Sequence, residues 1–322
     1  MITPLVNSGP VDNPDIEYEH RRNEKARIRV VALELETRPD FARPRHIDLM
    51  LRLGFTRVEI GVQSIYDDVL RRVKRGGHGV KEVIEATQYL KDAAYKVCYH
   101  IMPGLPGSTP DRDLEMVKTI FDDPSFMPDC VKVYPTFVIK DTELYEEWLR
   151  GLYRSYDEET WHWLLANIMA SIPPRWVRVM RFGRDIPLHW VVDGPKIGNM
   201  REVVLRDMEK LGLKCMEIRC REVGHKYVKR GGLVPTPRRL MINRIDYDAS
   251  GGHEVFLEVI DDDDTLYGIL RLRIPSSNAH RPEIRIGRAA LIRELHVYGP
   301  ELPIGSRQLT YSGGNTVVLV ER

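Results

Sequence analysis

Hydrophobic and polar positions in the first two thirds of the chain follow two alternating patterns. Short runs rich in β-branched and aromatic residues predict strands at residues 28–35, 58–61, 96–101 and 131–136. Helical periodicity and capping residues predict helices at 18–25, 44–53, 65–73, 80–93, 142–152 and 158–171, and another that begins at Thr109 and Pro110. Strands that alternate with helices of this length favour an α/β fold with a parallel sheet, either open or bent into part of a barrel.

The pattern changes after Gly212. Residues 213–239 hold two cysteines, a histidine and a basic, Gly/Pro-rich run, which is typical of a linker. From Leu240 onward, runs at 255–260, 266–274 and 284–297 predict strands, and we interpret the four aspartates at 261–264 as a solvated hairpin tip. The sequence thus predicts a leader at 1–17, an α/β domain at 18–212, the linker at 213–239 and an antiparallel β-rich domain at 240–322.

The composition is that of a globular protein with room for two domains. Its 322 residues are 43% hydrophobic and 30% charged. Because 48 basic residues face 47 acidic ones, for a net charge of +1, a nucleic-acid site has to be a local basic face. No apolar run approaches the roughly 20 residues of a membrane helix and the N-terminus has no signal pattern, so we expect no membrane association and a cytoplasmic location. Four cysteines are too few for a disulfide scaffold, which predicts reduced thiols.

Polar residues cluster where three predicted strands end. The clusters are residues 36–38, 61–64 and 100–102, and glycines follow the last of them. In parallel α/β folds the carboxyl ends of strands line the ligand crevice. Gln63 and Ser64 can hydrogen-bond a ribose or an amino acid head group, while Gly104 and Gly107 let backbone amides approach a ligand. Tight strand-to-helix turns explain the same residues about equally well.

A basic stretch follows the last predicted helix. It consists of Arg175, Arg178, Arg181 and Arg184, with Trp176 and Phe182 between them. Arginines next to aromatic residues suit contacts with RNA phosphates and stacking on bases. A solvated face with two aromatic residues in the core is the alternative, and the residues alone favour it.

The linker carries a candidate metal site. Cys215, Cys220 and His225 are spaced five residues apart, which is looser than the usual pairs of zinc sites but allows chelation. A fourth ligand is not obvious from the sequence. The alternative is a pair of ordinary thiols in a linker.

Three motifs in combination resemble the Elongator catalytic subunit family: residues 36–40 (Glu-Thr-Arg-Pro-Asp), 99–107 (Tyr-His-Ile-Met-Pro-Gly-Leu-Pro-Gly) and 293–299 (Arg-Glu-Leu-His-Val-Tyr-Gly). The resemblance spans roughly residues 18–305. It implies a partial parallel (β/α) radical-SAM barrel followed by an incomplete GNAT-type acetyltransferase α+β domain. The implied activity is tRNA wobble-uridine modification, in which acetyl-CoA and radical S-adenosylmethionine (SAM) chemistry give 5-carboxymethyluridine. The implied partners are tRNA and either Elongator-like subunits or further copies of this chain.

The resemblance also implies roles for particular residues. Those of the SAM pocket are Gln63, Ser64, His100 and Met102, and those of the acetyl-CoA site are Glu294, Leu295, His296 and Val297. Those that contact tRNA are Lys74, Arg75, Arg178, Arg181 and Arg184. Those of a structural zinc are Cys215, Cys220 and His225, with Glu217 where another cysteine is expected.

Two parts of the family pattern differ in this sequence. Radical-SAM proteins hold a 4Fe-4S cluster on three closely spaced cysteines, and none of the four cysteines has that spacing. We therefore expect the chain to begin partway through the family's barrel. Residues 308–315 stand where a Gln-x-x-Gly-x-Gly loop for the CoA pyrophosphate is expected, so CoA binding should be weak, and a frameshift near Gly314 is our hypothesis for that ending.

Two alternative functions follow from these differences. A truncated protein that binds tRNA without chemistry is one. A protein N-acetyltransferase that uses only the second domain is the other.

Overall fold

The computed structural model describes residues 15–172, 175–184, 186–229, 239–285 and 289–298. Most of the predicted leader, part of the linker and residues 308–315 lie outside this described part. No helix within it is long and apolar enough to cross a membrane.

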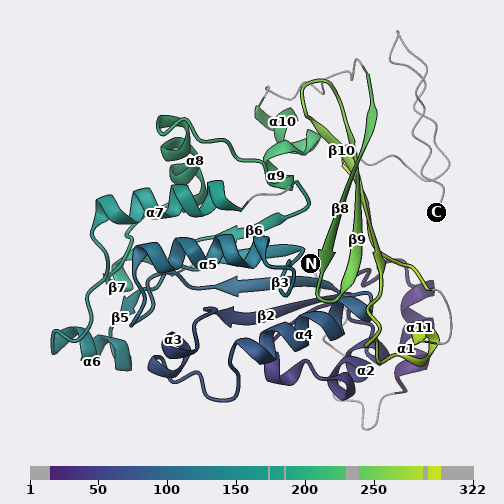
Figure 1. Ribbon diagram of the computed structural model, residues 1–322, viewed down its shortest axis with the longest axis horizontal. Helices are drawn as coiled ribbons and strands as arrows, with labels where there is room; N and C mark the ends of the chain where they lie inside the picture. The colour runs from purple at the N-terminus through teal and green to yellow at the C-terminus, as the bar shows by residue number, and fades with distance from the viewer. Residues whose placement is uncertain (1–14, 173–174, 185, 230–238, 286–288, 299–322) are drawn as a thin grey trace.

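A parallel sheet forms the centre of the first two thirds of the chain (Figure 1). All neighbouring strands pair in parallel, in the order β1-β2-β3-β4-β6. The α/β prediction with a parallel sheet is therefore confirmed. The strands are β1 (Glu34–Thr37), β2 (Arg57–Gln63), β3 (Lys96–Ile101), β4 (Cys130–Val133) and β6 (Arg178–Phe182), and a small antiparallel pair consists of β5 (Val138–Ile139) and β7 (Val191–Asp193).

Helices connect these strands and begin where the sequence supplies caps. The Thr109 hydroxyl accepts a hydrogen bond from the amide of Arg112, and the Asp157 carboxylate does the same for Thr160. The helices are α1 (Ile16–Lys25), α2 (Pro44–Arg52), α3 (Asp67–Arg72), α4 (Val80–Asp92), α5 (Pro110–Asp122), α6 (Glu143–Leu149), α7 (Glu158–Ser171), α8 (Met200–Lys210), α9 (Ile218–Arg221), α10 (Val223–Lys229) and α11 (Pro282–Arg285), with 3-10 turns at η1 (Pro39–Phe41) and η2 (Leu188–Trp190).

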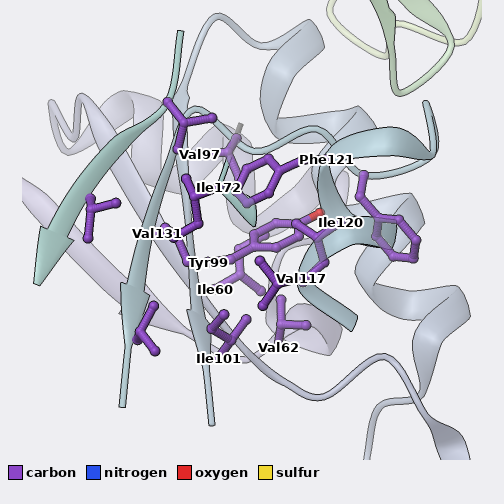
Figure 2. Close-up of a cluster of buried hydrophobic side chains, with 14 of the residues drawn as sticks. Ile60, Val62, Val97, Tyr99, Ile101, Val117, Ile120, Phe121, Val131 and Ile172 are labelled. Carbon is purple, nitrogen blue, oxygen red and sulfur yellow. The ribbon is translucent and has the colours of Figure 1, made fainter. Parts of the chain in front are cut away.

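The two faces of the parallel sheet differ sharply in polarity. Alternate residues of a strand point to opposite faces. One face carries Val97, Tyr99 and Ile101 of β3, which pack with Val117 and Ile120 of α5 in the main hydrophobic core (Figure 2). The opposite face carries charged residues of the same strands, which makes it the candidate for a ligand site.

A second sheet is antiparallel and packs at the amino ends of the parallel strands (Figure 1). Its order is β11-β10-β9-β8. The rings of Trp176 and Tyr247 stack across the junction with centroids 4.1 Å apart. The antiparallel prediction is thus confirmed for the strands β8 (Met241–Ala249), β9 (Gly252–Ile260), β10 (Leu266–Ile274) and β11 (Leu291–Val297).

Several predicted boundaries were wrong. Residues 28–33 are not a strand, because pairing with β2 starts only at Glu34, and Ile28 and Val31 are 74% and 80% exposed. The run at 284–297 is a helical turn followed by β11, and β8 was missed. The aspartate run does form a turn, but Asp261 is buried and its carboxylate accepts hydrogen bonds from the amides of Asp263 and Thr265.

Candidate functional site

The polar face of the parallel sheet holds a cluster of charged side chains from four strands. Glu59 of β2 lies at its centre and is 1% exposed. His100 of β3 places Nε2 2.5 Å from Glu59 Oε2, and the Lys132 ammonium of β4 donates to the same oxygen. Glu36 of β1 lies 3.1 Å from the other ring nitrogen of His100. Parallel register explains the cluster, since Glu36 pairs with Glu59 and His100 pairs with Lys132.

The electrostatics of this cluster keep Glu59 ionised. Burial alone raises the pKa of a carboxyl group, but hydrogen bonds from His100 and Lys132 outweigh it and lower the pKa of Glu59. Ligand atoms of Glu36, Glu59 and His100 lie within 4.8 Å of one another, a spacing that suits a metal ion. The ammonium of Lys132 supplies a counter-charge to Glu59 Oε2, while Glu59 Oε1 is buried without a hydrogen-bond partner among the described residues.

The carboxyl edge of the same face brings together most of the residues predicted for SAM. The Met102 amide donates to the Gln63 carbonyl at 2.8 Å, and His100 lies two residues before Met102 in the chain. Gln63 adopts φ +65°, an unusual conformation for a side chain other than glycine. Its Oε1 atom is buried without a hydrogen-bond partner among the described residues. Ser64 is buried beside it and accepts from the Tyr66 amide.

This edge suits a polar ligand because of the buried acceptor of Gln63. A buried acceptor without a partner costs free energy unless a ligand or water satisfies it. Arg184 also reaches the edge, with Nη2 3.9 Å from the Met102 sulfur and the guanidinium 5.3 Å from the centre of the Tyr134 ring. The donor, acceptor and thioether groups suit the ribose and amino acid parts of a nucleoside such as SAM.

A pocket of about 310 Å³ lies at the opposite, amino edge of the strands. Three of the four residues predicted for acetyl-CoA line it, and Val297 does not. Glu294 is fixed there by ion pairs with Lys96 and Arg271, and burial lowers the pKa of His296. The lining residues are Ala32, Leu33, Glu34, Thr56, Arg57, Lys96, Arg293, Glu294, Leu295 and His296.

The two predicted cofactor sets therefore lie at opposite ends of the strands. At roughly 3.3 Å per residue, a strand of the length of β3 separates them by about 20 Å. The charged cluster on the polar face extends to the pocket at the amino edge. Lys132 Nζ lies 3.4 Å from Glu34 Oε1, and Glu34 lines that pocket. Glu59 and Lys132 were missed by sequence analysis. Their signal was present as charged residues at alternate positions of strands that are otherwise buried.

The residues predicted to contact tRNA do not form one face. Arg75 and Arg184 approach the carboxyl edge, whereas Lys74 pairs with Glu143 on an exposed turn. Arg178 pairs with Glu222, and Arg181 is exposed on β6. Trp176 and Phe182 are buried, so the prediction that these aromatic residues stack on bases was wrong, since both belong to the core.

The linker cysteines differ from the prediction of reduced thiols. Cys215 and Cys220 form a disulfide with a Cα–Cα distance of 6.2 Å, because a short turn and α9 bring them together. Glu217 lies close to both sulfur atoms, while His225 is not part of this group. Cys98 and Cys130 are free thiols, as predicted, and burial raises the pKa of Cys98.

The cysteines of this chain do not fit a 4Fe-4S cluster. Such a cluster needs several thiolates around one cavity. Cys98 and Cys130 are buried side by side on β3 and β4, and the other two are joined to each other.

Comparisons with known proteins identify the family. Residues 7–120 match the Radical SAM superfamily and residues 128–210 match the Radical_SAM C-terminal domain. The chain is 49% identical over 291 residues to a tRNA uridine(34) acetyltransferase of Methanocaldococcus infernus, an overlap of 90% of this chain and 54% of that protein. It is 43% identical to Elongator complex protein 3 of Schizosaccharomyces pombe and 44% identical to that of Homo sapiens, covering 95% and 89% of this chain and 56% and 52% of those proteins.

A solved structure agrees with these matches. It is titled the archaeal Methanocaldococcus infernus Elp3 with an N-terminal deletion, and it superimposes with a TM-score of 0.83 at 49% identity, over 89% of this chain and 67% of that one. The chain spans about half the length of the curated relatives it matches. With these matches and the parallel sheet described above, the chain belongs to the Elongator complex protein 3 family of radical SAM proteins.

Proposed function

We propose that this chain acts in the modification of the wobble uridine of tRNA, giving 5-carboxymethyluridine from acetyl-CoA with radical SAM chemistry. The observation that carries the proposal is its 49% identity to a protein named tRNA uridine(34) acetyltransferase. The polar sheet face supports it, because its carboxyl edge carries the buried, unpartnered Gln63 Oε1 and a pocket lies at its amino edge. The relatives named Elongator complex protein 3 support further subunits, or copies of this chain, as partners in a cytoplasmic complex.

The carboxyl edge is the proposed SAM site. Gln63 and Ser64 would bind the ribose or amino acid part, and Met102 would pack against the adenosyl group. His100 would orient the ligand from within the Glu59 network. The role proposed for these residues of the chain is to bind and orient SAM and to exclude water from it.

The amino-edge pocket and β11 are the proposed acetyl-CoA site of an acetyltransferase-type α+β domain. Leu295 and Val297 are 67% and 47% exposed on a strand at the edge of the described sheet. Backbone groups of an edge strand can pair with the extended pantetheine, as an added strand does. Glu294 is held by Lys96 and Arg271, so it would position this strand and not move with the ligand.

The proposed tRNA contacts are five basic residues: Lys74, Arg75, Arg178, Arg181 and Arg184. Arg75 and Arg184 support this proposal most directly, because both lie near the carboxyl edge, which is the proposed SAM site. Burial and the nearby Arg38 lower the pKa of Arg75, which indicates a site where positive charge is concentrated. Arginine suits the recognition of phosphates by paired hydrogen bonds.

A structural zinc on Cys215, Cys220 and His225 is proposed only for the reduced protein. A disulfide leaves no thiolate for a metal. Reduction followed by measurement of bound zinc tests this, and no zinc uptake after reduction would contradict it.

The function is tested by tRNA binding together with acetyl-CoA turnover. A tRNA with uridine at position 34 and the same tRNA with cytidine there are compared in filter binding and in the release of free CoA. We expect Arg184→Ala to weaken tRNA binding about tenfold, and Arg206→Ala on the exposed face of α8 to have no effect.

The outcomes separate the proposed function from its alternatives. Release of CoA that depends on tRNA with uridine 34 supports the enzyme. Binding of tRNA without turnover favours the protein that binds tRNA without chemistry. Turnover on a basic peptide but not on tRNA favours a protein N-acetyltransferase and contradicts the proposal.

A further inference from the structure

The loop at residues 103–108 joins β3 to α5 at the carboxyl edge where the SAM residues lie. It follows Met102 directly, and the Pro103 carbonyl accepts a hydrogen bond from the Thr136 amide at 2.9 Å. Residues 103–106 are buried although they form a loop. The position of this loop therefore fixes the position of Met102 and of the adjoining backbone.

Both peptide groups of Gly104 within this loop are held by buried side chains. The Gly104 amide donates to Asp113 Oδ2 at 2.6 Å, and the Tyr153 hydroxyl donates to the Gly104 carbonyl at 2.7 Å. Gly104 has φ +81°, and a Cβ here would lie 2.6 Å from the ring of Trp161. Glycine is thus required, and the flexibility it brings is removed by these two contacts.

Asp113 serves three donors at once. Besides the Gly104 amide, it accepts from the Ser108 hydroxyl at 2.6 Å and from the Tyr156 hydroxyl at 2.9 Å. Asp113 is 2% exposed. Burial of a carboxylate is unfavourable, and an uncharged residue would suffice to fill the space. An anion with three donors is the arrangement that holds a loop in one position.

The groups around Asp113 leave it without an ion-pair partner among the described residues. Arg112, the adjacent residue of α5, is engaged with Asp68. From the segment before α7, Tyr153 and Tyr156 face the carboxylate with neutral hydroxyls, and Asp193 lies near Tyr153. Burial raises the pKa of Asp113 to about 6, with the hydrogen bonds from Ser108, Gly104 and Tyr156 opposing the shift.

We propose that Asp113 and Tyr153 are positioning residues for the ligand site at the carboxyl edge, because together they hold loop 103–108 through both peptide groups of Gly104. The loop in turn fixes Met102 against Gln63. This inference rests on the proposed SAM site. Neither residue touches the ligand; each acts through the loop.

Protonation of Asp113 gives the inference a distinctive signature. A protonated carboxyl group is neutral, so the Gly104 amide and the Tyr156 hydroxyl then donate to an uncharged oxygen, and such hydrogen bonds are weaker than those to an anion. Asparagine imitates this neutral state, since its amide oxygen carries no charge and its amide nitrogen can donate to the Ser108 hydroxyl. SAM binding by the unsubstituted protein should therefore weaken as the pH falls from 7.5 to 5.5, whereas the Asp113→Asn protein should bind weakly at both values.

The experiment measures SAM affinity by calorimetry at pH 7.5 and pH 5.5, together with thermal unfolding and hydrogen exchange of residues 103–108. We expect Asp113→Asn and Tyr153→Phe each to weaken binding about tenfold at pH 7.5 and to speed exchange at this loop. The matched controls are Asp111→Asn, an exposed carboxylate in the first turn of the same helix, and Tyr145→Phe on α6. Neither control should change affinity.

Two results would overturn the inference: folded Asp113→Asn and Tyr153→Phe proteins with unchanged SAM affinity, or an Asp113→Asn protein that keeps the pH dependence. If Asp113→Asn does not fold, Tyr153→Phe decides, since it removes one hydroxyl and keeps the ring. If the unsubstituted protein binds no SAM, both the proposed SAM site and this inference are contradicted. Unchanged hydrogen exchange in both variants separately contradicts the role of these residues in holding the loop.

Discussion

At the scale of single residues, the candidate site depends on charged side chains that the fold buries and pairs. Glu59 is the clearest example, since its carboxylate is shared by His100 and Lys132 from the two following strands. A buried charge of this kind is stable only with its partners in place. The polar face therefore contributes to folding in addition to its proposed role in ligand binding.

Replacement of Glu59 by glutamine should destabilise the protein by about 1–3 kcal/mol at pH 7, because Lys132 loses its buried counter-ion. The pKa of Glu59 is lowered in the folded state, so its contribution is present above the unfolded value of about 4.5 and is lost as the pH falls through the folded value. Urea unfolding at several pH values measures this. The difference between the two proteins should shrink below pH 4.5.

The control is Glu36→Gln, because the Glu36 side chain is 63% exposed although it reaches the same histidine. We expect a loss below about 1 kcal/mol there. Equal losses for the two variants would show that burial of Glu59 is not what makes it important.

At the scale of elements, the connections after the parallel strands decide the shape of the carboxyl edge. Gly104 lies in such a connection and packs on Trp161. Gly151 has a similar backbone, with φ +72°, but nothing lies within 4 Å of a Cβ built there. The two glycines thus share the conformational requirement and differ in the space around them.

Gly104→Ala should destabilise the protein by more than about 2 kcal/mol, since it adds a clash with Trp161 to the strain of a positive φ. Gly151→Ala should cost about 1 kcal/mol, from the strain alone. Thermal and urea unfolding of both variants provide the measurement. Similar losses at the two positions would mean that Trp161 moves aside without cost.

At the scale of the whole molecule, a buried ion cluster joins the two sheets. Arg293 of β11 forms two hydrogen bonds of 2.6 and 2.7 Å with Asp129, and it also pairs with Glu254 of β9. Arg273 joins Asp92 at the end of α4 to the same Glu254. These contacts fix β11, with its proposed acetyl-CoA residues, relative to the parallel sheet.

Arg293→Met should cost about 3–5 kcal/mol, because it leaves Asp129 buried with fewer counter-ions. We expect the antiparallel sheet to lose its attachment first, so that tryptophan fluorescence, to which Trp176 at the junction contributes, and far-UV circular dichroism no longer report the same transition. Arg244→Met is the control, since this arginine is 63% exposed and pairs with Asp246 on the surface. A single transition shifted no further than in the control would argue against the ion cluster as the attachment.

Lys91 lies inside this cluster, fully buried and 3.5 Å from Glu254. Burial lowers its pKa from 10.5 to about 8, with Asp129 and Glu254 opposing the shift. The unfolded state therefore binds more protons between these values, so that stability should rise with pH from 8 towards 10 by about 1–2 kcal/mol. Urea unfolding at pH 7.5 and 9.5 should show this rise in the unsubstituted protein and not in Lys91→Met. The same rise in both proteins would assign it to another group.

The sequence by itself determined the parallel class of the first sheet and the order of most of its strands and helices, whereas β6 and α8 were not predicted. Hydrophobic periodicity and caps such as Thr109 and Asp157 are local signals, and local signals are what a single sequence carries. They also located Gln63, His100 and Met102 at strand ends. They failed at residues 28–33, where an apolar run suits a strand but pairing begins only at Glu34.

Only the tertiary structure decided which residues meet. Register between strands brings Glu59, His100 and Lys132 together, although they are separated by 41 and 32 positions in the chain. It also assigns Arg175 to ion pairs with Glu258 and Asp264 and buries Trp176, so that part of a stretch predicted to meet RNA belongs to the junction of the two sheets. The physical reason is that the residues that bury a side chain or pair with its charge come from distant segments. The local pattern of hydrophobic and polar positions does not specify these contacts.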